Sequence, residues 1–127
     1  MQILLDTNFI LTTTKQKIDI QETTNQITSE PIEWLVPQDV LNELGNLQDR
    51  KGSKETDRQA AKLSFEIIQS LSPKIINLPT KNPNIDIKIV NYILDKPIIL
   101  ATLDKNLKSR VKNKILTIRG KKNLEII

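Results

Sequence analysis

The stretch Ile3-Leu4-Leu5-Asp6-Thr7-Asn8 lies at the start of the chain and indicates what kind of fold to expect. Three apolar residues run directly into a carboxylate, a hydroxyl and an amide, which is typical of a short buried strand with polar groups at its carboxyl end. Open α/β sheets keep their functional sites at that end of their strands. Other functional acids should therefore lie at element ends that can converge on Asp6.

Apolar strands and amphipathic helices alternate along the rest of the chain. The pattern predicts further strands at residues 33–36, 74–78, 98–101 and 115–118. It predicts helices at residues 38–47, 56–70, 85–94 and 105–111. Residues 9–30 are expected to form a turn and a weak helix from about residue 19 to 27, and Thr56 with Gln59 fits a capping box. This alternation predicts an α/β fold with three α/β/α layers around a parallel sheet of about five strands.

The length of 127 residues fits a single domain, 1–127, with a basic carboxyl-terminal strand and tail from about residue 105. The apolar runs are too short to cross a bilayer, and Met1 is followed at once by the first strand without a basic leader. A cytoplasmic protein with no membrane partner is therefore expected.

The chain contains no His and no Cys. It cannot build a Ser-His-Asp triad, a Cys nucleophile, a Cys/His zinc site or a disulfide. Any chemistry must come from carboxylates, hydroxyls, amides and amines. A site of that composition favours a hard cation such as Mg²⁺ or Mn²⁺.

Positive charge is concentrated at the carboxyl end. From Lys105 to Ile127 there are eight basic residues and one acid, whereas the remainder of the chain is mildly acidic. This asymmetry suggests a polyanionic partner, although a Lys-rich solvated surface explains it equally well. The residues expected to contact such a partner, if it is RNA, are Lys105, Lys108, Arg110, Arg119, Lys121 and Lys122.

Four acids are distinguished by their positions. Asp6 and Asp104 follow two apolar strands, Asp86 falls in the first turn of a helix, and Glu43 lies beside the apolar stripe of another helix. In a parallel sheet, strand ends of one kind and the starts of the following helices share one edge, so these carboxylates can meet in one cleft. Such a cluster is unfavourable unless a cation neutralises it. A divalent metal does so, and it can also activate water for attack on a phosphodiester.

Each acid also has a purely structural interpretation. Asp6 is then a strand-end polar residue, Asp86 favours the helix dipole, Asp104 caps a helix, and Glu43 is a surface residue. Capping does not exclude metal binding. Neutral groups that would orient ligands around such a metal are Thr7, Asn8 and Thr102.

Four motifs in this order resemble the PIN-domain family of metal-dependent ribonucleases. They are LLDTNFIL, VPQDVLNEL, NIDIKIV and ILATLDKNLK, followed by ILTIRGKKNL, and the likeness covers essentially the whole chain. The resemblance implies that the family's acidic tetrad falls on Asp6, Glu43, Asp86 and Asp104. Metal binding is then expected at Asp6, Asp86 and Asp104. The basic strand and tail look most like small archaeal PIN proteins akin to the ribosomal-RNA-processing members.

One departure from the family pattern is the pair Asp86-Ile87, where many relatives have two Asp residues. The leading hypothesis is a Mg²⁺- or Mn²⁺-dependent endoribonuclease. The missing acid motivates an alternative, a PIN-like RNA-binding or ribosome-assembly module that does not cut. A second alternative is the toxin ribonuclease of a toxin-antitoxin pair. PIN relatives often dimerise, so the resemblance allows a homodimer.

Overall fold

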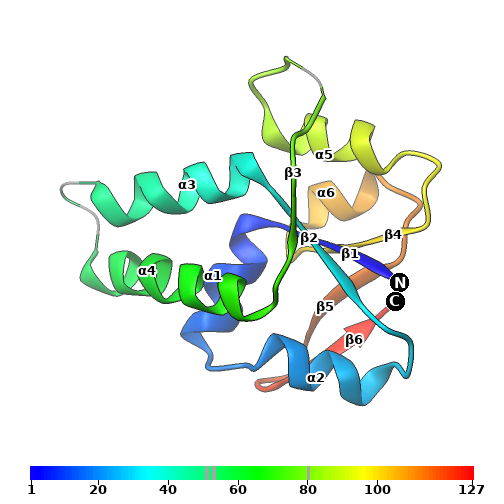
Figure 1. Cartoon of the computed structure of the whole chain (residues 1–127), viewed down its shortest axis with the longest axis horizontal. Coiled ribbons are helices and arrows are strands. Elements are labelled where there is room, and N and C mark those ends of the chain that lie inside the picture. Colours follow the sequence, from blue (N-terminus) through cyan, green and yellow to red (C-terminus); the bar gives the residue numbers. More distant parts are fainter. Residues whose placement is uncertain (51, 53, 80) are drawn as a thin grey trace.

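The centre of the molecule is one six-stranded sheet (Figure 1). The computed structural model describes residues 1–50, 52, 54–79 and 81–127. The strands are β1 (Gln2–Leu5), β2 (Glu33–Pro37), β3 (Lys74–Ile76), β4 (Ile98–Ala101), β5 (Ile115–Arg119) and β6 (Asn123–Ile126). They lie in the order β3-β2-β1-β4-β5-β6, and every neighbouring pair is parallel except β5 with β6.

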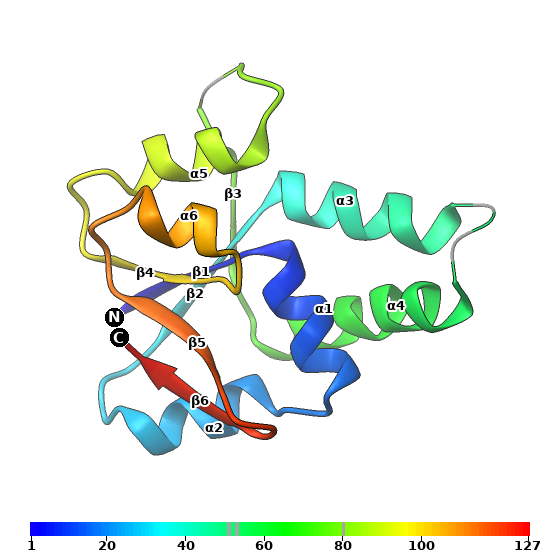
Figure 2. The same cartoon turned by 180° about the vertical axis from the view of Figure 1, so that it is seen from behind.

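Helices cover both faces of this sheet, which confirms the three-layer α/β/α prediction. They are α1 (Thr7–Lys15), α2 (Ile20–Ile27), α3 (Gln38–Asp49), α4 (Glu55–Ser70), α5 (Ile85–Ile93) and α6 (Lys105–Ser109). The views from opposite sides show α3 and α4 as a pair that projects beyond the sheet (Figures 1 and 2). Within the described residues, no helix is long and apolar enough to span a bilayer.

The alternation of side chains along β1 divides the interior into two cores. Ile3 and Leu5 point into a core that also contains buried residues of α1, α2, α3 and α4. Leu4 points to the opposite face, into a core formed with α5 and α6. All three side chains are fully buried. Because β1 is central and covered on both faces, its apolar run needs no polar alternation.

The sequence prediction was wrong about the carboxyl terminus and about residues 9–18. What was expected as a basic tail contains β6, which pairs antiparallel with β5. Gly120 begins the turn between them with a φ of +65°, a conformation that glycine adopts without strain. Residues expected to form a turn belong instead to α1, which buries Phe9 and Ile10 fully.

The predicted capping box of Thr56 with Gln59 was also wrong. Helix α4 begins one residue earlier, at Glu55, and its N-cap Lys54 makes no side-chain capping bond. The Gln59 side chain donates instead to Glu55 Oε1 over 3.1 Å. Thr56 therefore lies inside the first turn, where its hydroxyl is not placed to cap the helix.

The sheet order creates a switch point between β1 and β4. From β1 the chain crosses to β2 and β3 on one side, whereas β4 and β5 lie on the other side. Crevices at the carboxyl ends of such strands are the usual ligand sites of open α/β sheets. Asp6 directly follows β1, and Asp104 comes shortly after β4.

Candidate metal centre

Asp6 is held in place by the ends of both central strands. Its backbone N–H donates to the carbonyl of Ala101 over 3.0 Å, which extends the pairing of β1 with β4 by one residue. The residue is 7% exposed. One carboxylate oxygen accepts from the Thr7 N–H over 2.9 Å and so caps α1, while the other accepts from the Thr102 hydroxyl over 2.8 Å. The carboxylate is thus fixed at the switch point.

Thr102 also connects Asp6 to Asp104. Its hydroxyl oxygen accepts from the Asp104 N–H over 3.2 Å. The Asp104 carboxylate caps α6, accepting from the N–H groups of Asn106 and Leu107 over 2.8 and 3.3 Å. The capping interpretation of Asp104 is therefore confirmed, and it leaves one oxygen of that carboxylate outside the capping bonds.

The four predicted acids lie close enough for their charges to act on one another. Burial raises the pKa of Asp6 above its ordinary value, and the negative charges of Asp86 and Asp104 raise it further. Hydrogen bonds from Thr102 and from the Thr7 N–H act in the opposite direction and lower the pKa. Asp86 contributes from the first turn of α5, next to the central strands.

Glu43 is half-buried on α3 and belongs to the same cluster. Its pKa is raised mainly by burial, and then by the charges of Asp6, Asp86 and Asp39. The Thr7 hydroxyl lowers this pKa to a lesser extent, yet it is buried and makes no hydrogen bond of regular geometry within the described residues. The Thr7 hydroxyl thus faces the Glu43 carboxylate without a regular hydrogen bond, and water or a ligand can complete the contact at such a position.

The donors in this cluster suit a hard divalent cation. Carboxylate and hydroxyl oxygens are the ligands that Mg²⁺ and Mn²⁺ prefer. Burial is the main cause of the raised pKa values of Asp6 and Glu43, and repulsion from the neighbouring acids, which a cation would relieve, adds to it. No three His, Cys, Asp or Glu side chains of the described chain stand close enough together to hold a metal ion.

Comparison with known proteins identifies the family. The model of a family described as "PIN like domain" matches residues 3–121. The chain belongs to the PIN-like domain family. This is a nuclease family, and its nucleases generally use divalent metal ions. A comparison with curated protein sequences gave no significant match.

Two solved structures share this PIN-like fold. The structure of the PIN domain endonuclease Utp24 is 24% identical, covers 98% of this chain and 90% of its own, and superposes with a TM-score of 0.79. VapBC2 from Rickettsia felis, bound to a DNA fragment from their promoter, is 14% identical, covers 92% and 98%, and has a TM-score of 0.63. At these identities the likeness concerns the fold.

The remaining predicted site residues of this PIN-like domain lie on α1, on and just after α6, at the end of β5 and in the turn that follows β5. Asn8 is exposed in the first turn of α1. Lys108 is half-buried, and its amine donates to the Thr117 hydroxyl of β5 over 3.2 Å. The exposed basic residues are Lys105, Arg110, Arg119, Lys121 and Lys122. Lys122 also donates to the Gln16 carbonyl at the end of α1.

Sequence analysis missed two charged residues beside the carboxylates, Asp39 and Lys88. Asp39 lies in the first turn of α3, four residues before Glu43 and therefore on the same helix face. Lys88 follows Asp86 by two residues in α5, and its amine contacts Asp39. The spacing of Asp39 from Glu43 was a signal available in the sequence, but nothing there indicated its pairing with Lys88.

Stability should respond to pH through Asp6 and Glu43. In the folded state their pKa values are raised from 3.8 and 4.5, so the unfolded chain releases these protons first as pH increases. Their contribution to the free energy of unfolding is thus largest at low pH and is lost as pH rises through the raised values. Because asparagine does not ionise, Asp6→Asn does not undergo the part of this fall in unfolding free energy that comes from Asp6.

We therefore expect the free energy of unfolding of Asp6→Asn to exceed that of the wild type by an amount that grows as pH rises from about 4. Urea unfolding without divalent metal, at a series of pH values, measures this difference. A difference that stays constant with pH would contradict the prediction.

Proposed function

We propose that this PIN-like domain is a divalent-metal-dependent endoribonuclease that hydrolyses RNA phosphodiester bonds. The observation that supports it most is that the acids of three other segments, Glu43, Asp86 and Asp104, lie within electrostatic range of Asp6, which follows β1 at the switch point. A chain without His or Cys cannot use a His-based or Cys-based site for hydrolysis. Membership of a nuclease family is consistent with this proposal.

In this proposal Asp6, Asp86 and Asp104 bind the cation, which is Mg²⁺ or Mn²⁺, and Glu43 assists them. A bound divalent cation supplies positive charge at the phosphodiester and lowers the pKa of water. The Thr102 hydroxyl holds the Asp6 carboxylate in position through its hydrogen bond. The buried hydroxyl of Thr7 is available to orient a ligand or water near Glu43.

RNA is the proposed substrate because the domain carries exposed basic residues on and after α6. Double-stranded or single-stranded RNA binds such residues through its phosphates. Ribosomal RNA is the first substrate class to test, since the basic segment resembles that of rRNA-processing relatives.

Incubation of the purified protein with ribosomal RNA fragments in Mg²⁺, in Mn²⁺ or in EDTA tests the proposal. We expect internal cleavage with a divalent ion and none in EDTA. Cleavage that persists in EDTA would refute metal dependence. If the protein binds the RNA fragments tightly in every condition but cleaves none of them, the result would favour an RNA-binding module that does not cut.

A PIN-like RNA-binding module that does not cut is the second candidate. It is favoured by the finding that no three acids of the described residues stand close enough to hold a metal ion. In this case RNA affinity would be insensitive to metal and to Asp6→Asn. Mn²⁺ density between Asp6 and Asp104 in a soaked crystal would exclude it.

The basic residues should contribute to RNA affinity in a salt-dependent way. Replacing Arg119 and Lys121 together by alanine is expected to weaken binding to all RNA sequences and to reduce the slope of log affinity against log salt by about 0.7 for each phosphate that the variant no longer neutralises. Fluorescence anisotropy in EDTA at several salt concentrations measures the slope. Lys62→Ala, on the exposed side of α4, is the matched control and should leave the slope unchanged. Equal slopes for all three proteins would contradict the prediction.

A further inference from the structure

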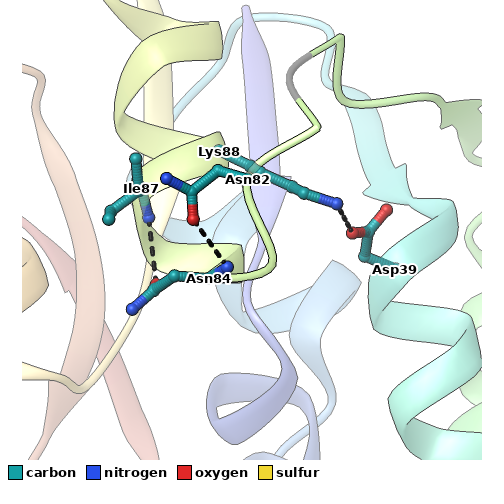
Figure 3. Close-up of polar contacts among 5 residues, drawn as sticks. All are labelled: Asp39, Asn82, Asn84, Ile87 and Lys88. Carbon is teal, nitrogen blue, oxygen red and sulfur yellow. Dashed lines mark hydrogen bonds and ion pairs between the residues drawn. The ribbon is translucent and has the colours of Figure 1, made fainter.

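An ion pair connects the two helices that carry Asp86 and Glu43. The Lys88 amine of α5 lies 2.9 Å from a carboxylate oxygen of Asp39 in α3 (Figure 3). The two side chains are 17% and 22% exposed, which makes this the most buried ion pair within the described residues. An ion pair withdrawn from water is screened less and is more sensitive to the loss of one partner than a surface pair.

Packing alone does not set the distance between these helices. Val40 and Leu44 of α3 belong to the core on one face of the sheet. Ile89 and Ile93 of α5 belong to the core on the opposite face. Neither core, as far as the described residues define it, contains apolar residues from both helices. The ion pair therefore forms a direct polar connection between them.

Local hydrogen bonds shape the start of α5 but do not connect it to α3. The Asn84 side chain accepts from the Ile87 N–H over 3.2 Å, and the Asn84 N–H donates to the Asn82 side chain over 2.8 Å (Figure 3). These bonds lie within one segment. The long Lys88 side chain extends from this segment toward Asp39, as Figure 3 shows.

We propose that Lys88 and Asp39 are a positioning pair, which holds α5 at the distance from α3 that lets Asp86 and Glu43 act on one divalent cation. This inference rests on the proposed metal-dependent function. Neither partner needs to touch the cation, because the amine and the carboxylate satisfy each other. Glu43 and Asp86 lie on the two helices that this pair joins, so the spacing of α3 and α5 sets the distance between their carboxylates.

The direction in which cation affinity changes in each variant separates a positioning role from a simple charge effect. Removing the positive charge of Lys88 makes the surroundings of the four acids more negative, so an electrostatic role alone predicts tighter cation binding by Lys88→Met. The same reasoning predicts weaker binding by Asp39→Asn. A positioning pair predicts weaker binding by both variants, by about tenfold each, as is typical when groups that support metal ligands are lost.

Mn²⁺ affinity, measured by calorimetry or electron paramagnetic resonance without RNA, is the readout. We expect both single variants to bind Mn²⁺ more weakly than the wild type. The double variant that exchanges the two residues, Asp39→Lys with Lys88→Asp, should bind Mn²⁺ more tightly than either single variant. The controls are two single variants, Lys15→Met and Asp57→Asn, each of which breaks the exposed ion pair between α1 and α4. Both should bind Mn²⁺ like the wild type. Unfolding curves confirm that each variant is folded.

Opposite shifts in the two single variants, wild-type affinity in both, or no recovery in the exchanged pair would overturn the positioning role and leave the nuclease proposal intact. A wild-type protein that cleaves RNA only with Mn²⁺ supports the nuclease proposal independently. A wild-type protein that neither binds Mn²⁺ nor cleaves RNA would overturn both.

Discussion

Replacing Asp6 by asparagine is expected to lower metal-dependent RNA cleavage by a factor of at least about 10² to 10³. The amide has nearly the same shape as the carboxylate, and its oxygen can still accept from the Thr7 N–H that caps α1. Its NH₂ group can donate to the Thr102 hydroxyl oxygen, which replaces the bond that Asp6 accepts now. The variant loses the negative charge at the centre of the cluster and, with it, affinity for a cation.

Cleavage rates over a series of Mn²⁺ concentrations that reaches saturation measure this effect. The control is Asp49→Asn, because Asp49 is an exposed acid at the end of α3 and should be dispensable. Unfolding curves should show that Asp6→Asn is at least as stable as the wild type at neutral pH, since it removes a buried and repelled charge. Cleavage by Asp6→Asn at the wild-type rate would place the activity elsewhere.

Two substitutions at Asp104 should separate its capping role from its proposed metal role. Asp104→Asn keeps an oxygen that can accept from the Asn106 and Leu107 N–H groups, and asparagine caps helices about as well as aspartate. We expect cleavage to fall by about 10² while stability changes little. Asp104→Ala should lose the same activity and also about 1 kcal/mol of unfolding free energy, because the cap is gone.

Asp19 provides a matched control for the cap. Its carboxylate accepts from the Glu22 N–H over 3.0 Å at the start of α2, and no acid of the cluster belongs to that helix. Asp19→Ala should lose a similar amount of stability without losing cleavage. Activity and urea unfolding measured on all four proteins test both statements. Full cleavage by Asp104→Asn would reduce Asp104 to a capping residue.

The apolar strands made most of the fold predictable. Strand 98–101 was predicted with its observed bounds because four consecutive apolar residues are covered on both faces. Helix α1 was missed because Thr12, Thr13 and Thr14 have low helix propensity. In the structure the Thr13 and Thr14 hydroxyls donate to the carbonyls of Phe9 and Ile10, over 2.8 and 2.7 Å. Burial of the Phe9 and Ile10 side chains stabilises the helix.

The candidate site was predictable in its acids but not in its connections. Asp6, Asp86 and Asp104 could be selected because strand ends and helix starts share one edge of a parallel sheet. The bond from Thr102 to Asp6 joins residues 96 positions apart, and it depends on the pairing of β1 with β4. The pairing of Lys88 with Asp39 depends on how two helices on opposite faces meet at that edge.

The stretch from Ile3 to Asn8 by itself determined a buried strand and the polar groups at its end, because hydrophobic runs and their termini are local properties of the chain. Only the tertiary structure decided that β4 lies next to β1, which brings Thr102 and Asp104 to Asp6. It also decided which charges lie within range of one another, and hence the raised pKa values of Asp6 and Glu43. These are properties of distance in space, which one sequence does not specify.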